Sequence, residues 1–360
     1  MSRDERADDG YSPEDGTGPT GPKIGPAKAD GSGRERTEPV TAGVIGVGSM
    51  GQHHARVYAE LPGVELAGVT DADPDRAAAV AARHGTRALS IDALMETVAV
   101  VSVAVPTAHH HGIARKCIEQ GVDVLVEKPF VADPEAGRAL TALAAERGVV
   151  LQVGHIERFN PAVRAARDVL DGQEVIAVDA RRLGAPRERE IGDDAVMDLM
   201  IHDIDVLLSL VESEIDLVNA VGARDNRYID AQLRFANGVV ASLTASRVTQ
   251  KKIRELSITT EESLITVDYI SQLVEVHRQS LPEYVEGNGG VRYRHEEVVE
   301  RPMVESGEEL RTELAAFIES ATAGTEPVVT GEDGVRALEV ARWITDLAAG
   351  ERRALEVDSQ

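Results

Sequence analysis

Apolar runs and helical segments alternate along the first half of the chain. The apolar runs have the length and continuity of strands that are buried on both faces of a parallel sheet. We expect these strands at 40–47, 64–71, 98–105, 122–129 and 149–155. Helical periodicity separates them, from His53 onward and over 111–121 and 133–148. Alternation of strand and helix at this spacing predicts an α/β fold with a doubly wound parallel sheet.

The second half of the chain changes to period-two alternation, which is typical of strands with one buried face. Residues 229–248 contain a hairpin signal at Asn237-Gly238, a dipeptide suited to tight turns. Residues 253–278 supply two or three more strands, and 282–303 an irregular excursion with one strand. The pattern predicts a second, sheet-containing domain, followed by amphipathic helices at 307–322 and 331–349.

The segment 197–208, MDLMIHDIDVLL, has the composition of a buried helix but carries acids and a histidine. At about 100° per residue, Asp198, His202 and Asp205 fall within a wedge of roughly 60° on one face. Apolar residues occupy most of the remaining surface, broken only by Asp203. Because a surface helix has the opposite proportions, we expect the polar wedge to face a cavity.

The composition excludes several classes of partner. The chain has 360 residues, 42% of them hydrophobic, which is enough for two domains with their own cores. Its net charge of −24 argues against binding to nucleic acid or to anionic membrane, since both need a basic patch. The basic residues are 6 Lys and 32 Arg, a balance that resembles the acidic proteins of salt-adapted microbes. A bacterium with a GC-rich genome is the alternative source.

Cysteine usage and the terminal segments complete this picture. The single cysteine, Cys117, excludes an internal disulfide and a thiolate metal cluster, and we expect no metal site. No apolar stretch is long enough to span a membrane, so we expect a soluble, cytoplasmic protein. Residues 1–39 are rich in acids, Gly and Pro, and are expected to form a disordered tail.

A glycine turn carries the clearest chemical signal. Gly46-x-Gly48-x-x-Gly51 joins a predicted strand to a predicted helix, and Asp71 ends the next strand about 20 residues on. In this Rossmann context the backbone of the turn, with Ser49 and Met50, approaches a pyrophosphate at the helix N-terminus. Asp71 would accept hydrogen bonds from a ribose diol and repel a 2′-phosphate. We therefore expect NAD, and NADP less, although Arg76 would soften that preference.

Polar residues gather where the predicted parallel strands end, which is the edge at which such sheets bind ligands. They are Thr107, His110, Glu127, Lys128 and His155, and Pro106 lies among them. We expect Pro106, Thr107, His110, Glu127 and Lys128 to contact the cofactor. Lys128 lies between Glu127 and Pro129 and is expected to be held in place, because proline restricts the residue before it. Its ammonium group could polarise a sugar hydroxyl or the carbonyl formed from it.

Taken together and in this order, the motifs resemble the glucose-fructose oxidoreductase and inositol dehydrogenase family of sugar oxidoreductases. The motifs are the glycine turn, VPTAHHHGIA, LVEKP, GHIERFNP and DLMIHDID, and the resemblance covers about residues 41–350. It implies a Rossmann domain paired with an α+β domain whose sheet is open and mostly antiparallel. The far face of such a sheet often makes oligomer contacts, so a homodimer or homotetramer is expected.

The same resemblance implies a domain organisation in which the second domain is inserted before helices that return to the Rossmann domain. The expected parts are a tail at 1–39, the Rossmann domain at 40–158, the sheet domain at 159–306, the returning helices at 307–350 and a tail at 351–360.

The family's reacting groups match Lys128, Asp198 and His202 of this sequence. We expect His202 to act as general acid or base, because imidazole titrates near neutrality. Lys128 would stabilise the developing alkoxide, and either of the two could move the proton. An i, i+4 spacing places Asp198 on the face of His202, where it would orient the imidazole or bind a substrate hydroxyl. Asp205 would orient His202 from behind, or be solvated or capping.

The substrate implied by the resemblance is a nucleotide sugar, since the segments match best the branch that oxidises UDP-N-acetylglucosamine at C3. A diphosphate needs cations, and basic residues cluster near predicted loops and strand ends, among them Arg181 and Lys251. The candidate substrate-binding residues are His155, Arg158, Asn160, Arg182, Asp205, Lys252 and Arg254. One alternative is a dehydrogenase of a free polyol or aldose, and a second is an NAD-binding regulator without catalysis.

Overall fold

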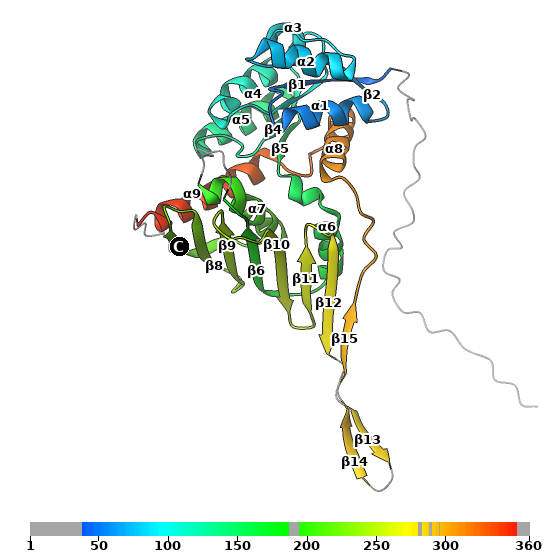
Figure 1. The fold of residues 1–360 in the computed structure, drawn as a ribbon, viewed down its shortest axis with the longest axis vertical. Helices are drawn as coiled ribbons and strands as arrows, with labels where there is room; N and C mark the ends of the chain where they lie inside the picture. The colour runs from blue at the N-terminus through cyan, green and yellow to red at the C-terminus, as the bar shows by residue number, and fades with distance from the viewer. Residues whose placement is uncertain (1–37, 187–193, 280–282, 288–289, 295, 351–360) are drawn as a thin grey trace, which may run out of the picture. The chain divides into compact units, whose positions relative to one another are not determined.

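A five-stranded parallel sheet forms the first half of the protein in the computed structural model (Figure 1). The structure describes residues 38–186, 194–279, 283–287, 290–294 and 296–350. Residues 1–37 of the tail expected at 1–39, and the tail expected at 351–360, lie outside this range. The strand order is β2-β1-β3-β4-β5, which confirms the predicted doubly wound parallel sheet. Its strands are β1 (Val40–Ile45), β2 (Val64–Thr70), β3 (Val100–Val103), β4 (Asp123–Glu127) and β5 (Leu151–Gly154).

Helices cover both faces of this sheet, as the alternating pattern requires. From the first half of the chain come α1 (Gly51–Glu60), α2 (Pro74–His84), α3 (Ile91–Met95), α4 (His110–Glu119) and α5 (Pro134–Arg147). Two helices from the end of the chain join them, α8 (Glu309–Ala323) and α9 (Gly331–Ala348). Leu310, Leu314 and Phe317 of α8 pack in one cluster with Tyr58 of α1, so the chain end does return to the first sheet. Cys117 is buried in α4, where burial raises the pKa of its thiol to about 12.

The second sheet has eight strands in the order β15-β12-β11-β10-β6-β9-β8-β7. Every neighbouring pair is antiparallel except β6 and β9. The strands are β6 (Val175–Leu183), β7 (Ile215–Ala223), β8 (Tyr228–Phe235), β9 (Val240–Ser246), β10 (Ile253–Thr260), β11 (Leu264–Asp268), β12 (Leu273–Gln279) and β15 (Glu297–Glu300). The mostly antiparallel sheet is thus confirmed.

Several elements of this half differ from the sequence expectations. The pattern did not predict β6 or β7, nor α6 (Pro161–Leu170). The prediction of one strand in 282–303 is wrong, because β13 (Glu283–Gly287) and β14 (Gly290–Arg294) pair with each other before β15 joins the large sheet. Glutamate and glycine make up three of the five residues of β13, which weakens its strand signal.

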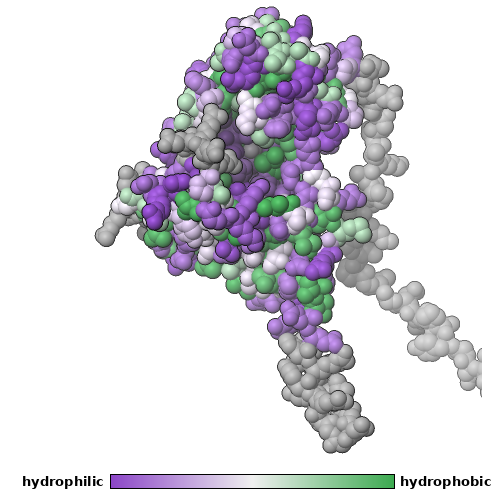
Figure 2. All heavy atoms as spheres, viewed as in Figure 1, coloured by the Kyte–Doolittle hydropathy of each residue, from purple (hydrophilic) through white to green (hydrophobic). Residues whose placement is uncertain are grey.

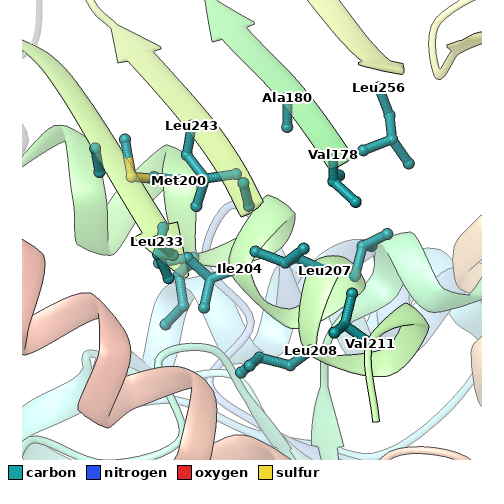
Figure 3. Packing of buried hydrophobic residues seen from close by; sticks show 14 of the residues in the cluster. Val178, Ala180, Met200, Ile204, Leu207, Leu208, Val211, Leu233, Leu243 and Leu256 are labelled. Carbon is teal, nitrogen blue, oxygen red and sulfur yellow. The ribbon is translucent and has the colours of Figure 1, made fainter. Parts of the chain in front are cut away.

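The catalytic-motif helix packs on the inner face of the eight-stranded sheet. A short π-helix (Val196–Met200, η3) leads into α7 (Ile201–Leu210). Figure 3 shows Met200, Ile204 and Leu207 lying against Leu243 and Leu256 of the sheet, and all five belong to one buried cluster. Each fully buried aliphatic side chain contributes about 1.5–3 kcal/mol. This packing fixes the position of the helix that carries Asp198 and His202.

The exposed surface is mainly hydrophilic, with scattered hydrophobic patches (Figure 2). Strand residues opposite the inner face are partly exposed, including Ile176, Val221, Val240 and Leu273. Among the residues that the structure describes, no helix is both long and apolar enough to cross a membrane.

Candidate active site

The glycine turn between β1 and α1 has the backbone geometry that its spacing predicted. Gly46 has a φ of 86°, in the region that favours glycine. A Cβ at Gly51 would lie 1.8 Å from the carbonyl oxygen of Gly46, so only glycine allows the helix to start this close to the strand. A Cβ at Gly48 would meet no atom closer than 3.8 Å, because Gly48 borders open space. The turn is therefore a cradle that a phosphate group can approach.

That open space is a cavity of about 1020 Å³, large enough for a dinucleotide. Seven of the predicted cofactor residues line it: Gly46, Gly48, Ser49, Met50, Asp71, Arg76 and Pro106. Gly51 lies under the turn as the first residue of α1, and Thr107 starts the short η1 helix (Thr107–His109) outside the lining. His109 and Ile113 line the cavity as well and were not predicted.

Asp71 is held rigidly at one end of this cavity. Its carboxylate accepts hydrogen bonds from the backbone N–H of Val47 at 2.8 Å and of Asp73 at 2.9 Å. Arg76 Nη1 lies 3.6 Å from Asp71 Oδ1, and Arg76 also bonds Asp73. A fixed carboxylate at this position suits a ribose diol and opposes a 2′-phosphate.

His110 does not face the cofactor cavity. It is buried, and its Nδ1 lies 3.0 Å from the carbonyl oxygen of Pro129 and 3.1 Å from that of Phe130. Its Nε2 lies 2.8 Å from the carbonyl oxygen of Val105. The prediction that His110 contacts cofactor does not fit this geometry. Because a buried imidazole must find hydrogen-bond partners, His110 instead ties the end of β3 to the turn that holds Lys128.

A second cavity, of about 370 Å³, adjoins the first and is called the crevice below. The two share Met50, Ala104 and Val105 in their linings. Lys128 and His202 also line the crevice, together with Glu127, Gly154 and Ile156. The crevice thus places the two predicted proton-handling groups beside the cavity that fits the dinucleotide.

Lys128 is joined to the start of the catalytic helix. Its Nζ donates a hydrogen bond of 2.8 Å to the backbone carbonyl of Asp198 and lies 3.7 Å from Asp198 Oδ1. Asp198 Oδ2 lies 2.7 Å from Arg247 Nη2, in an ion pair. Asp198 therefore orients Lys128, with Arg247 as a second cation beside it. The expected contact between Asp198 and His202 is not found among the described residues. The wider π turn changes the side-chain spacing, as π turns at functional sites often do.

His202 lies in an electropositive, largely dry environment. Burial, the ammonium of Lys128 and the nearby Arg182, His155 and Arg254 all lower the pKa of His202, well below its usual range. Its Nδ1 is buried without a hydrogen-bond partner among the described residues. His202 is thus neutral at physiological pH and can accept a proton in the crevice.

One of the expected wedge residues, Asp205, forms a buried ion pair instead of facing the crevice, and so does Asp203, which was expected to lie outside the wedge. Asp205 accepts two hydrogen bonds from Arg158, at 2.7 and 2.9 Å. Asp203 accepts two from Arg182, at 2.8 and 2.7 Å, and Arg182 also bonds Glu157. The predictions that Asp205 lies behind His202 and that Arg158 and Arg182 contact substrate do not fit this geometry. Charges this deeply buried need partners, and the two arginines are engaged by acids.

Of the remaining predicted substrate residues, His155 and Asn160 are buried, whereas Lys252 and Arg254 border a cavity. His155 is buried, and burial lowers the pKa of its imidazole. Asn160 is buried and caps α6, with its Oδ1 accepting from the backbone N–H of Ala162. Lys252 and Arg254 line a third cavity of about 310 Å³, whose wall Asn160 also forms.

A buried polar layer lies under the crevice, on the side of the first sheet that α1 and α8 cover. His54 Nε2 and Glu127 Oε1 are 2.9 Å apart, and this contact and the charge of Lys128 lower the pKa of Glu127 against the opposing effect of burial. Gln152 and Glu313 are completely buried, and their side-chain polar atoms have no partner among the described residues. Burial and then the charges of Glu127 and Asp205 raise the pKa of Glu313 well above its usual range. The surroundings of Glu313 therefore favour the neutral form of its carboxyl group.

The arrangement provides what hydride transfer to a nicotinamide needs: a phosphate cradle, a carboxylate at the ribose end, and an ammonium and a neutral imidazole at the other end of a connected space. The residues fit a dinucleotide without rearrangement of the glycine turn. Fold and site together define a dinucleotide-dependent oxidoreductase.

Comparison with known proteins identifies the family. The family model for an oxidoreductase family with an NAD-binding Rossmann fold matches residues 40–155, and the model of that family's C-terminal alpha/beta domain matches residues 177–356. The chain belongs to this family, the glucose-fructose oxidoreductase and inositol dehydrogenase family that its motifs resemble. It is an oxidoreductase whose cofactor is NAD.

Individual relatives fall within the same family. UDP-N-acetylglucosamine 3-dehydrogenase of Acidithiobacillus ferrooxidans is 36% identical over 83% of this chain and 94% of its own length. scyllo-Inositol 2-dehydrogenase (NAD⁺) of Bacillus subtilis is 28% identical over 84% of this chain and 92% of its own. A solved structure of the Acidithiobacillus enzyme superposes with a TM-score of 0.77 at 34% identity, covering 86% of this chain and 98% of that one. Levoglucosan dehydrogenase in complex with NADH and levoglucosan shares the fold, with a TM-score of 0.74 at 22% identity over 88% and 98% of the two chains.

Sequence reasoning missed three residues that the structure brings to the site. Arg247 pairs with Asp198 from the end of β9, a contact that no local pattern signals. His109, and not His110, borders the cofactor cavity. The sequence could not distinguish them, because a run of three histidines does not show which one faces the cavity. Glu313 sits in a helix whose apolar face includes Leu310, Leu314 and Phe317. An acid in the middle of that apolar face was the sequence signal that could have identified Glu313 as a buried carboxyl group.

Proposed function

We propose that the protein oxidises UDP-N-acetylglucosamine at C3 to the 3-keto sugar with NAD as hydride acceptor. The single observation that carries the dehydrogenase assignment is the crevice itself, where Lys128 and His202 border a space continuous with the dinucleotide cavity. The sugar and the carbon are taken from the Acidithiobacillus relative, which is 36% identical over most of the chain.

NAD, when bound, supplies the nicotinamide carbon that accepts the hydride from the sugar. Gly46, Gly48 and Ser49 would hold its pyrophosphate, and Asp71 its adenosine ribose. Arg76 borders the same ribose end, where its positive charge partly offsets the negative charge of Asp71.

The chain's own residues handle the proton. Neutral His202 accepts the hydroxyl proton as the C–H bond breaks, since its lowered pKa keeps the imidazole unprotonated. The Lys128 ammonium, fixed by the Asp198 carbonyl, stabilises the negative charge that develops on the same oxygen. Asp198 is a positioning residue, because it acts through Lys128.

The assembly and location form part of the same proposal. A homodimer or homotetramer would cover the partly exposed residues on the outer sheet face, such as Ile176, Val221 and Leu273. Light scattering tests this. The cofactor and the nucleotide sugar are both cytoplasmic metabolites, so the proposal places the enzyme in the cytoplasm.

A substrate panel tests the activity. Purified protein is assayed with NAD at low and high salt against UDP-N-acetylglucosamine, other UDP-sugars, myo-inositol, scyllo-inositol and glucose, following NADH absorbance. The proposal expects turnover with UDP-N-acetylglucosamine that exceeds every free sugar by at least about a hundredfold in kcat/KM. Turnover only with free polyols or aldoses would assign the chain to the inositol-type alternative. Tight NAD binding without turnover of any sugar would favour the non-catalytic regulator.

A further inference from the structure

Three arginines lie at one edge of the large sheet, near the end of β6, after the end of β9 and at the start of β10. Side chains alternate between the two faces of a strand, and Val178 and Ala180 of β6 point inward, as does Leu256 of β10 (Figure 3). Arg182 and Arg254 continue these two rows and are paired in register. Arg247 follows the inward row of β9, after Leu243 and Ala245. In a chain with a net charge of −24, this concentration of cations at one edge calls for an anionic partner.

Arg182 and Arg247 pair with acids of the protein, and Arg254 borders a cavity. Arg182 bonds Asp203 and Glu157, and Arg247 pairs with Asp198. Arg254 lines the third cavity, and its Nη1 donates to the carbonyl oxygens of Leu183 and Ile253, both at 2.7 Å, which fixes the direction of the guanidinium.

Lys252 adds a second cation to the same cavity. It directly precedes β10 and lines the cavity together with Arg254. Lys251 and Lys252 are both exposed, but only Lys252 is part of the lining.

The cavity also holds a buried hydroxyl group without a partner. Tyr269 lines it, is 4% exposed, and its Oη has no hydrogen-bond partner among the described residues. Two carboxylates share the lining, Glu157 and Glu309. Glu157 is bonded by Arg182 and Asn160, and Glu309 by Asn160 and Gln272, so both already have donors.

This third cavity adjoins the crevice. Ile156 lines both. The positive charge of Arg254 reaches His202, whose pKa it helps to lower. A ligand with its reacting sugar between Lys128 and His202 can therefore extend past Ile156 to the two cations.

We propose that the cavity bordered by Lys252, Arg254 and Tyr269 binds the diphosphate and nucleoside end of the nucleotide-sugar substrate. The inference rests on the proposed function and explains why the enzyme would prefer a nucleotide sugar to a free sugar. A free sugar fills the crevice alone, whereas a nucleotide sugar occupies both the crevice and this cavity. Lys252 and Arg254 bind phosphate oxygens, and the Tyr269 hydroxyl gains a polar partner.

Binding of UDP to the NAD-loaded protein tests the site. NAD is kept saturating so that UDP does not enter the dinucleotide cavity, and the ionic strength is the same for every variant. Titration calorimetry should give a Kd for UDP that rises about tenfold in Lys252→Ala, through loss of one charge-assisted contact. It should rise further in the double variant Lys252→Ala/Arg254→Ala. Lys251→Ala is the matched control and should bind UDP as the wild type does.

Kinetics with UDP-N-acetylglucosamine give a second readout. Lys252→Ala should raise KM about tenfold and change kcat less than about twofold, since uniform binding is lost without harm to the reacting groups. Equal UDP affinity in the wild type and the double variant, or no UDP binding to the NAD-loaded wild type, would overturn the assignment.

These experiments distinguish an error in the proposed nucleotide site from an error in the proposed function. Oxidation of UDP-N-acetylglucosamine with UDP affinity unchanged in the double variant removes the site and leaves the function. UDP binding that Lys252→Ala weakens, without turnover of UDP-N-acetylglucosamine, supports the site and removes that sugar as substrate.

Discussion

Lys128 Nζ and the backbone carbonyl of Asp198 are joined by a hydrogen bond of 2.8 Å. The bond links the turn after β4 of the first sheet to the π turn that begins the catalytic helix. Because the carbonyl, and not only the carboxylate, holds the ammonium, the position of Lys128 depends on the backbone of the second domain. The backbone of the second domain therefore helps to place the cation of the crevice.

Replacing the ammonium group should remove catalysis and spare cofactor binding. Lys128→Met keeps much of the side-chain volume but cannot stabilise an alkoxide, so kcat should fall by about 10²–10³. The Kd for NADH, measured by fluorescence, should change less than about threefold because the phosphate cradle is untouched. An unchanged kcat would exclude Lys128 from the reaction.

The acid side of the pH profile should report His202. A histidine whose pKa is lowered well below the usual 6.5 loses its role as a base only when the pH falls to that lowered pKa. The logarithm of kcat/KM should therefore stay level from pH 8 to below 6.5 and decline only at more acidic pH. His202→Ala should lower kcat by about 10²–10⁴ and remove this decline from the residual rate. A decline centred at or above pH 6.5 in the wild type would contradict the lowered pKa.

Cofactor preference should depend on the charge of Asp71. Asp71→Asn retains an oxygen that can accept a backbone hydrogen bond but no longer repels a 2′-phosphate. The ratio of kcat/KM for NADP to that for NAD should rise about tenfold or more, since removing a like-charge contact is worth on the order of 1–2 kcal/mol. Asp75→Asn, an exposed change in α2, serves as control. The same ratio in Asp71→Asn and in the wild type would mean that Asp71 does not select the cofactor.

Glu313 should make the protein less stable as the pH rises. Its folded-state pKa is raised, so the folded protein keeps a proton that the unfolded chain releases above about pH 4.5. The stability linked to this group is fully present below that pH and is lost as the pH rises toward the folded-state pKa. Glu313→Gln is neutral at every pH and should be more stable than the wild type at pH 8, by on the order of 1–3 kcal/mol, with little difference at pH 4.5.

Thermal unfolding between pH 4.5 and 8 measures this difference. Glu319→Gln changes an exposed glutamate of the same helix and should follow the wild-type curve. Parallel stability curves for Glu313→Gln and the wild type would show that Glu313 is ionised in the folded protein.

The sequence was sufficient for the parts of the site that local spacing encodes. The glycine turn, Asp71 and the turn at Lys128 depend on one strand end each, so periodicity and spacing locate them. The helix at 197–208 was recognised by its unusual proportion of apolar residues, and His202 does face the crevice.

Contacts between distant segments were beyond that reasoning. A helical wheel assumes 100° per residue, whereas η3 is a π turn. The wheel also places Asp205 near His202, although the carboxylate of Asp205 is bound by Arg158. Which arginine pairs with an internal acid and which lines a cavity depends on strand register. Arg182 and Arg254 are opposite each other in β6 and β10; Arg182 bonds Asp203, and Arg254 lines the third cavity.

The destination of the C3 hydrogen tests the central claim most directly. UDP-N-acetylglucosamine carrying deuterium at C3 is incubated with the protein and NAD, and the reduced cofactor is analysed by mass spectrometry. The proposal predicts that the NADH formed carries one deuterium and that the deuterated sugar reacts more slowly than the unlabelled one wherever hydride transfer limits the rate. NADH without deuterium, or no NADH from this sugar under any salt condition, would contradict it.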